Sequence, residues 1–180
     1  MIDASYAPNG DDRKSISGTV TSLGGTIVSW SSTTQKTVTL SSCESEYVAL
    51  ASAAKELLFI QSLLGEFNSA VLPGIMFEDN MGAIFLVRNS QVGQRTKHID
   101  IRAHFLRDIK RDGKMDVEHI KTDNNEADVC TKNTIERLLT KHVENMRAGR
   151  LYCWRHWDEI MEKHRDNGNL KSGAFEGRMS

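Results

Sequence analysis

An acidic residue in an apolar position is the first feature of this sequence that could do chemistry. Residues 39–67 have the spacing of an amphipathic helix, and their leucine, isoleucine and alanine side chains form one stripe along it. With about 100° between successive residues, Glu46 falls on that stripe, four residues before Leu50. Burying an unpaired carboxylate is costly. Glu46 therefore either curls out to water at the helix start, where the helix dipole favours an acid, or faces a cation.

The neighbouring Glu44 has a simpler explanation. Ser41 is followed three residues later by Glu44, which is the pattern of a capping box. In that arrangement the hydroxyl and the carboxylate each accept a hydrogen bond from a free amide at the helix start. Glu44 and Glu46 point about 200° apart because two residues separate them. Capping explains Glu44 and leaves Glu46 unexplained.

Other acids also lack a local explanation. Asp3 lies at the end of a short extended segment, and Asp79 ends a strand in which it shares one face with Ile75 and Phe77. Glu78 lies on the opposite face of that strand and is expected to point away. Asp79 thus continues an apolar row, as Glu46 does.

Asp128 is the last of these acids. Asp123 and Glu126 have the spacing of a second capping box, which leaves Asp128 without a capping role. Each acid alone also fits a purely structural interpretation. Four of them at the ends of elements that can meet at one sheet edge favour a shared cation site, because clustered carboxylates repel unless a divalent ion neutralises them. Their oxygens suit Mg²⁺ or Mn²⁺, and two ions about 4 Å apart suit phosphodiester hydrolysis.

The elements that must position these acids alternate between strands and helices. Gly24 and Gly25 separate two segments of alternating β-branched and polar residues, which is typical of a hairpin, and residues 36–40 are predicted to form a further strand. The other predicted elements are a helix after Ser41, a strand at 74–79, helices at 80–89 and 99–113, a strand at 114–120 and a last helix after Asp123. This order predicts an α/β fold, with an antiparallel meander feeding an alternation of strands and helices.

Length and composition predict one domain. A chain of 180 residues that is 39% hydrophobic can bury one core, which we assign to residues 1–149. Residues 150–180 are predicted to be a C-terminal extension, helical in part and then disordered. No apolar run approaches the length of a membrane span, and three widely spaced cysteines without a CxxC pair indicate reduced thiols in an intracellular protein.

Charge gives only a local indication of a nucleic-acid partner. The formal net charge of -1 excludes a generally basic protein. Residues 88–114 nevertheless contain eight lysines or arginines and three aspartates. Such a stretch is either a solvated helix face or a patch that contacts phosphates.

A series of motifs resembles one known family. The motifs are, in order, "DASYA", "DDRKSISG", "VSWSS", "QKTVTLSSCESEYVAL", "FEDNMGAI", "RTKHIDIRAHFLRD" and "NNEADVCTK". They are similar to the ribonuclease H domain that ends the polyprotein of copia-type LTR retrotransposons, over about residues 1–151. The resemblance implies a ribonuclease H-like fold, with a five-stranded mixed sheet flanked by helices.

The resemblance also implies an activity. A domain of this family would hydrolyse the RNA strand of an RNA/DNA hybrid during reverse transcription and leave 5′-phosphate products. Its partners would be the hybrid and the reverse transcriptase of the same polyprotein, with no membrane involved. It would act inside the cell, in a cytoplasmic virus-like particle or in the nucleus.

Roles for individual residues follow from the same resemblance. The four acids of the family correspond here to Asp3, Glu46, Asp79 and Asp128. Asp3 would bridge two Mg²⁺ or Mn²⁺ ions, and Glu46 and Asp79 would hold the ion at the leaving 3′ oxygen. Asp128 would hold the ion that activates the attacking water.

Substrate contacts are expected from the basic stretch. Its candidate substrate-binding residues are Arg95, Lys97, His98 and Arg102. They would contact the backbone and the 2′-hydroxyls of the hybrid without reading its sequence. His98 has a substrate or proton role as one interpretation and a structural hydrogen bond as the other.

Two departures from the family pattern leave alternatives open. Ser5 stands where the family usually has a second acid, and the loop before Asp128 lacks the histidine that many cellular relatives place there. One alternative is a catalytically idle domain that binds nucleic acid or acts as a scaffold. An intact set of four acids counts against it. The other alternative is a nuclease or transposase that acts on DNA.

Overall fold

Five strands, four α-helices and two short 3-10 helices make up the part of the chain that the structure describes. The structure is a computed structural model that describes residues 1–8, 12–67, 73–89, 97–149, 151, 159 and 162, with only the backbone of 97–101 and 103. The strands are β1 (Ile2–Ser5), β2 (Ile16–Leu23), β3 (Thr26–Thr34), β4 (Gly74–Glu78) and β5 (Met115–His119). The helices are α1 (Ser42–Glu66), α2 (Met81–Arg88), α3 (Lys97–Arg111), η1 (Thr122–Asn124), η2 (Glu126–Cys130) and α4 (Glu136–Arg147).

The first three strands form an antiparallel meander. β2 and β3 make the predicted hairpin, whose turn residues Gly24 and Gly25 have φ of +58° and +81°. β1 pairs with β2 so that Asp3 lies opposite Gly18. The meander therefore has the predicted antiparallel order.

The further strand predicted at 36–40 is wrong. Its alternating residues form a loop between β3 and α1, because side chains tie this segment to its neighbours in place of a backbone ladder. The Gln35 side chain donates to the Ser17 hydroxyl (2.8 Å) and to the Ser45 carbonyl (2.9 Å). The Thr39 hydroxyl lies 2.9 Å from that of Ser15.

The last two strands form a separate parallel ladder. β4 pairs with β5, and β1 packs beside β4 in the middle of the molecule. Among the described residues, the five strands are thus divided between a ladder of three and a ladder of two. The α/β class with mixed strands is confirmed, whereas one continuous five-stranded ladder is not what these residues form.

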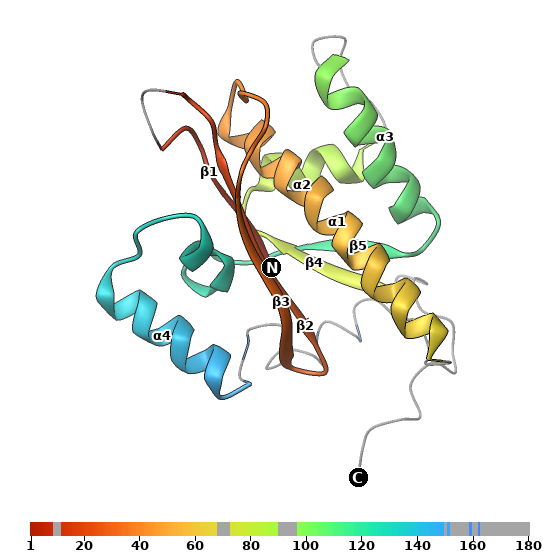
Figure 1. The fold of residues 1–180 in the computed structure, drawn as a ribbon. Helices are drawn as coiled ribbons and strands as arrows, with labels where there is room; N and C mark the ends of the chain where they lie inside the picture. Colours follow the sequence, from red (N-terminus) through yellow and green to blue (C-terminus); the bar gives the residue numbers. More distant parts are fainter. Residues whose placement is uncertain are drawn as a thin grey trace.

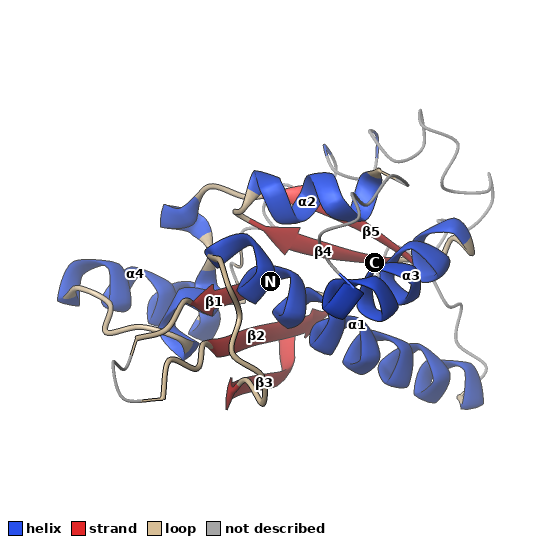
Figure 2. Ribbon diagram, turned by 90° about the horizontal axis from the view of Figure 1, so that it is seen from above, coloured by secondary structure: helices blue, strands red, loops and turns tan. Residues whose placement is uncertain are grey.

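Helices cover both sides of the strands (Figure 1). α1 packs on β1 and β2, and α2 and α3 pack on α1 and β5. η2 lies against β1 and β2 on the other side, with α4 beyond it, as the view from above also shows (Figure 2). Two buried apolar clusters fill these layers, one containing Tyr47, Leu50 and Leu106 and the other containing Val20 and Leu151.

The start of α1 follows the predicted capping pattern. The Ser41 side chain accepts a hydrogen bond from the Glu44 amide (3.1 Å), and the Glu44 carboxylate accepts one from the Leu40 amide (2.7 Å). By length and apolar composition alone α1 could cross a membrane, which is weak evidence because core helices pass the same test. Here its first turns are buried around the whole circumference, from Ser45 to Ala51.

The second capping box is wrong. η1 begins without a side-chain cap, and the Asn125 side chain caps η2 by accepting from the Ala127 amide. Asp128 therefore lies in a 3-10 turn and not in an α-helix. This tighter turn keeps the segment close to β1, which matters for the site described below.

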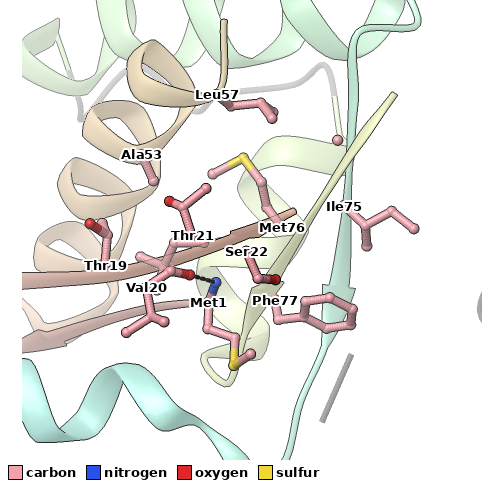
Figure 3. A pocket seen from close by; sticks show the side chains of 12 residues that line it. Met1, Thr19, Val20, Thr21, Ser22, Ala53, Leu57, Ile75, Met76 and Phe77 are labelled. Carbon is pink, nitrogen blue, oxygen red and sulfur yellow. Dashed lines mark hydrogen bonds between the residues drawn. The ribbon is translucent and has the colours of Figure 1, made fainter. Parts of the chain in front are cut away.

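A small cavity of about 110 Å³ lies where the two ladders meet (Figure 3). β2, β4 and the first residues of β1 line it, and the Met1 ammonium at its edge donates to the Val20 carbonyl at 2.7 Å. Leu57 of α1 closes one side. The junction between the ladders is thus less completely packed than the cores on either side.

Candidate metal centre

Three aspartates from distant parts of the chain meet at the junction of the two ladders. One carboxylate oxygen each of Asp3, Asp79 and Asp128 lies within 4.8 Å of the other two. Asp3 comes from the middle of β1, Asp79 directly follows β4, and Asp128 belongs to η2. The predicted convergence of these three acids is what the structure shows, and their catalytic role stays a prediction.

A glycine allows η2 to approach closely enough. A Cβ on Gly18, opposite Asp3, would lie 2.5 Å from the Thr131 methyl carbon and 3.0 Å from the Ala127 carbonyl oxygen. The Asn125 side chain fixes the approach by donating to the Ile2 carbonyl at 2.7 Å. The Thr131 hydroxyl in turn donates to the Asp3 carboxylate. Backbone contact between β2 and η2 therefore brings Asp128 to Asp3.

A second group of acids adjoins the first. Oxygens of Glu46, Glu78 and Asp79 also lie within 4.8 Å of one another, so Asp79 belongs to both groups. The expectation that Glu78 points away is wrong. Alternation along β4 correctly places Glu78 on the opposite face of the strand from Ile75. That face is not solvent-exposed, however, because Met76, which shares it, packs in the core with residues of α1. That is the side on which the start of α1 presents Glu46.

Burial and like charges raise the pKa values in this centre. Asp3, Glu46, Glu78 and Asp128 are at most 5% exposed. Burial first, and then the Glu78, Asp3 and Asp79 carboxylates, raise the pKa of Glu46 to about 10. Burial is also the main cause that raises the pKa of Glu78 to about 8 and that of Asp128 to about 7.

Lys132 supplies a positive charge to part of the centre. Its ammonium lies 3.2 Å from the Asp3 carboxylate and 3.3 Å from that of Asp128, one helical turn earlier in the chain. Partial burial acts to lower the pKa of Lys132, but Asp3 and Asp128 outweigh it and hold the pKa above its usual value. The Lys132 ammonium therefore pairs with two of the five clustered carboxylates.

The donor set fits divalent cations. Carboxylate oxygens are hard ligands of the kind that Mg²⁺ and Mn²⁺ prefer. The Oε2 atoms of Glu46 and Glu78 are buried and have no hydrogen-bond partner among the described residues. Buried carboxylate oxygens in this state are unfavourable unless a proton or a cation satisfies them.

Comparisons with known proteins identify the region. The chain is 38% identical over 130 residues to the retrovirus-related Pol polyprotein from transposon TNT 1-94 of Nicotiana tabacum, and 39% identical over 131 residues to that from transposon RE1 of Arabidopsis thaliana. The chain is related to one region of copia-type retrotransposon Pol polyproteins. The matches cover 72% of this chain and about a tenth of each relative's length. No family model matches the chain.

The fold of this Pol-related chain has a counterpart among solved structures. It matches LC11-RNase H1, isolated from compost, with a TM-score of 0.57 over 77% of this chain and 94% of the other. The identity is 18%, so the match concerns the fold. The predicted resemblance to copia-type polyproteins and the predicted ribonuclease H-like fold are both confirmed.

The predicted substrate-binding residues are described only in part. Arg95 lies outside the described residues, and Lys97 and His98 begin α3 with side chains that the structure does not describe. Arg102 is half-buried and lines a groove of about 480 Å³. Their role in binding substrate stays a prediction.

Part of the basic stretch has a structural role. Arg88 pairs with Glu118 at 3.6 Å and donates to the Val117 carbonyl at 2.6 Å, and Lys110 pairs with Asp116. These pairs fasten α2 and α3 to β5. The number of positive charges in residues 88–114 therefore overstates what is available for phosphates.

The sequence did not predict a role in this centre for several polar residues around it. They are Glu78, Thr122, Asn125, Thr131 and Lys132. The Thr122 hydroxyl donates to the Asp79 carboxylate at 2.7 Å. The spacing of Lys132 from Asp128 was a usable signal, because residues four apart in a helical turn can form an ion pair. Nothing in the local sequence links Thr122 to Asp79, which lies 43 residues away.

Proposed function

We propose that this chain is a metal-dependent ribonuclease H that hydrolyses the RNA strand of RNA/DNA hybrids by a two-metal-ion mechanism. The observation that carries the proposal is the meeting of Asp3, Asp79 and Asp128 within 4.8 Å on a ribonuclease H-like fold. The relationship to Pol polyproteins supports reverse transcription as the setting. We further propose that the reverse transcriptase of the same polyprotein is its partner, in a cytoplasmic virus-like particle or the nucleus.

The two groups of acids divide the task of holding cations. Asp3, Asp79 and Asp128 would hold one ion, and Glu46 with Asp79 would hold the other, which makes Asp79 the shared ligand in place of Asp3, the bridging ligand that the resemblance implies. Bound Mg²⁺ or Mn²⁺ would supply Lewis acidity, which lowers the pKa of an attacking water and offsets charge on the leaving oxygen. Thr122 and Thr131 orient Asp79 and Asp3 through the hydrogen bonds described above.

The groove near Arg102 supports a contact with a nucleic-acid backbone. Hydroxyl side chains of β2 and β3 line it together with Lys36, Lys55 and Arg102. Hydroxyls and cations are the groups that contact phosphates and sugars without reading sequence. The Gln35 side chain also lines this groove and donates to the Ser45 carbonyl, next to Glu46.

One observation favours a catalytically idle domain as the second candidate. The Lys132 ammonium contacts both Asp3 and Asp128, so a fixed positive charge already stabilises these two acids. In an idle domain this ion pair would be a purely structural replacement for a metal. Such a domain would keep the fold and the groove and would lack a need for divalent cations.

Cleavage of a labelled RNA/DNA hybrid tests the proposal. With Mg²⁺ or Mn²⁺ the chain should cut the RNA strand and leave 5′-phosphates, while DNA duplex and RNA duplex stay intact. Asp79→Asn should fold and should lose at least about 10³-fold in rate, since Asp79 belongs to both groups. A parent that binds hybrid but cuts nothing supports the idle domain. Preferential cutting of DNA duplex indicates a DNA nuclease.

A further inference from the structure

Glu78 is a buried acid for which neither the family pattern nor its place in the strand provides a role. It is 0% exposed, and its Oε1 atom accepts a hydrogen bond from the Asn80 amide at 3.0 Å. Its Oε2 atom is buried and has no hydrogen-bond partner among the described residues. A carboxylate half satisfied and wholly buried is costly. The burial of the Glu78 carboxylate therefore requires a compensating interaction.

We infer that Glu78 is a fifth carboxylate of the metal centre and completes a divalent-cation site with Glu46 and Asp79. Oxygens of these three residues lie within 4.8 Å of one another. The inference rests on the metal requirement of the proposed function and is independent of the substrate. It assigns a ligand that the four-acid pattern does not contain.

The distribution of positive charge supports this assignment. Lys132 pairs with Asp3 and Asp128, and the Met1 ammonium donates to the Val20 carbonyl. In the described parts of the chain, none of Glu46, Glu78 and Asp79 forms an ion pair with a lysine, an arginine or a histidine. The Met1 ammonium and Lys132 act on Glu78 and Glu46 without pairing with them, and both pKa values stay raised. The group that contains Glu78 thus lacks the paired ammonium that Asp3 and Asp128 have.

The geometry around Glu78 is suited to ligation. The Asn80 amide holds Oε1 from the β4–α2 turn, which fixes the carboxylate and leaves the buried Oε2 without a hydrogen bond. The start of α1 fixes Glu46, and the Thr122 hydroxyl fixes Asp79. The carboxylates of Glu78 and Asp79 are therefore held by hydrogen bonds from two different segments, and Glu46 is placed by the buried start of α1.

Titration with Mn²⁺ tests the inference without relying on catalysis. Mn²⁺ binding is measured by the rise in melting temperature and by the loss of the free Mn²⁺ signal in electron paramagnetic resonance. The variant Glu78→Gln keeps the size of the side chain and removes its charge. We expect it to require at least about 10-fold more Mn²⁺ than the parent for the same melting shift. Without metal it should melt at the same temperature as the parent or higher, because a like charge has gone.

Two further variants serve as controls. Glu44→Gln removes a carboxylate from the same end of α1 but outside the cluster, and it should bind Mn²⁺ as the parent does. Glu78→Asp keeps the charge on a shorter side chain and should retain part of the affinity lost in Glu78→Gln. It also keeps the test valid if Glu78→Gln fails to fold.

The outcomes separate the two proposals. If Glu78→Gln weakens Mn²⁺ binding while the parent cuts no hybrid, the inference stands and the proposed function falls. If the parent cuts hybrid and Glu78→Gln binds Mn²⁺ as the parent does, the function stands and the inference is overturned. A parent that binds no Mn²⁺ by either measurement overturns the inference. If Glu78→Gln does not fold, a Glu78→Asp variant that binds Mn²⁺ as tightly as the parent also overturns the inference.

Discussion

Glu46, Glu78 and Asp128 differ from ordinary surface carboxylates in that their pKa values are raised. Burial and mutual repulsion raise the pKa values of Glu46 to about 10, of Glu78 to about 8 and of Asp128 to about 7. At a pH between the unfolded and the folded pKa values, the folded protein therefore keeps protons on these acids that the unfolded chain has released. Without a metal ion, these protons reduce the repulsion among the clustered carboxylates.

A pH dependence of stability follows. Because the folded pKa values are raised, the metal-free protein is stabilised at low pH and loses this stability as pH rises from about 4, near the unfolded pKa values, to about 10, the raised pKa of Glu46. Melting curves in a chelator should show a falling melting temperature over this range. Mn²⁺ should give a larger gain at the upper end, where the ligands are deprotonated.

Glu46→Gln and Glu44→Gln isolate the cause of this dependence. Glu46 faces Glu78, Asp3, Asp79 and, at lesser strength, Lys132. Glu46→Gln should therefore flatten the metal-free profile and abolish most cleavage. Glu44→Gln should keep the slope and cost about 1 kcal/mol or less as a capping change. Identical profiles for the two variants would contradict the assignment of Glu46.

At this scale the sequence indicated Glu46 for a physical reason that the structure upholds. The apolar stripe left two interpretations, exposure to water at the helix start or burial facing a cation, and the 5% exposure of Glu46 excludes the first. Glu78 was missed because alternation along a strand assigns residues to two faces of the sheet but does not show which face packs against the start of a helix. Lys132 was missed because a lysine is usually exposed on the protein surface without a specific partner.

At the scale of elements, the position of η2 decides whether the acids meet. η2 lies against β1 and β2 at the one position in the register where β2 offers a glycine opposite Asp3. The sequence indicated an element containing Asp128 but gave it the wrong form. A 3-10 turn capped by Asn125 places Asp128 beside Asp3, and the hydrogen bond from Asn125 to Ile2 is a long-range contact that no local pattern encodes.

The substitution Gly18→Ala tests this packing. Its Cβ would lie 2.5 Å from Thr131 and 2.9 Å from Cys130, so η2 must move away from β2. We expect a loss of about 1–3 kcal/mol in urea unfolding and a smaller melting gain from Mn²⁺, because Asp128 moves away from Asp3.

Gly24→Ala is the matched control for this test. Gly24 has φ of +58° and no atom within 4 Å of its Cβ position. Alanine there should cost about 1 kcal/mol through backbone strain alone and should leave the response to Mn²⁺ unchanged. Equal metal responses of Gly18→Ala and the parent would show that η2 does not position the site.

The loop at 36–40 shows where element prediction failed. Alternating β-branched residues are typical of a strand, yet a strand also needs a free neighbouring edge. The Gln35 side chain bonds to Ser17 and Ser45, and the chain leaves the sheet there. Side-chain bonds between distant residues thus decided the outcome. The α1 cap, which needs only residues within one turn, was predicted correctly.

At the scale of the whole molecule, the metal centre lies between two separately bonded ladders. Asp3 and Asp128 belong to the side of the three-stranded ladder, whereas Glu78 and Asp79 belong to the two-stranded one. Repulsion among these acids acts across the junction, where the ladders also leave the small cavity lined by Val20 and Met76 (Figure 3). A cation shared by both sides would join the two ladders.

Hydrogen exchange should reveal this arrangement. In a chelator we expect the amides of β4 and β5 to exchange faster than those of β2 and β3, because the smaller ladder can open by itself. Mn²⁺ should slow exchange most strongly in β4 and β5. Mass-spectrometric exchange of the parent and of Asp79→Asn would measure both effects. Uniform protection with and without Mn²⁺ would contradict a centre that joins the ladders.

The ion pair of Lys132 with Asp3 and Asp128 sets an order of events. A tethered ammonium acts as a permanent competitor at a high effective concentration, so a free cation meets less competition at Glu46, Glu78 and Asp79. A first ion would thus be held by these three acids, and an ion held by Asp3 and Asp128 would compete with the Lys132 ammonium. Metal binding at Asp3 and Asp128 would then be an exchange of one counterion, the Lys132 ammonium, for another.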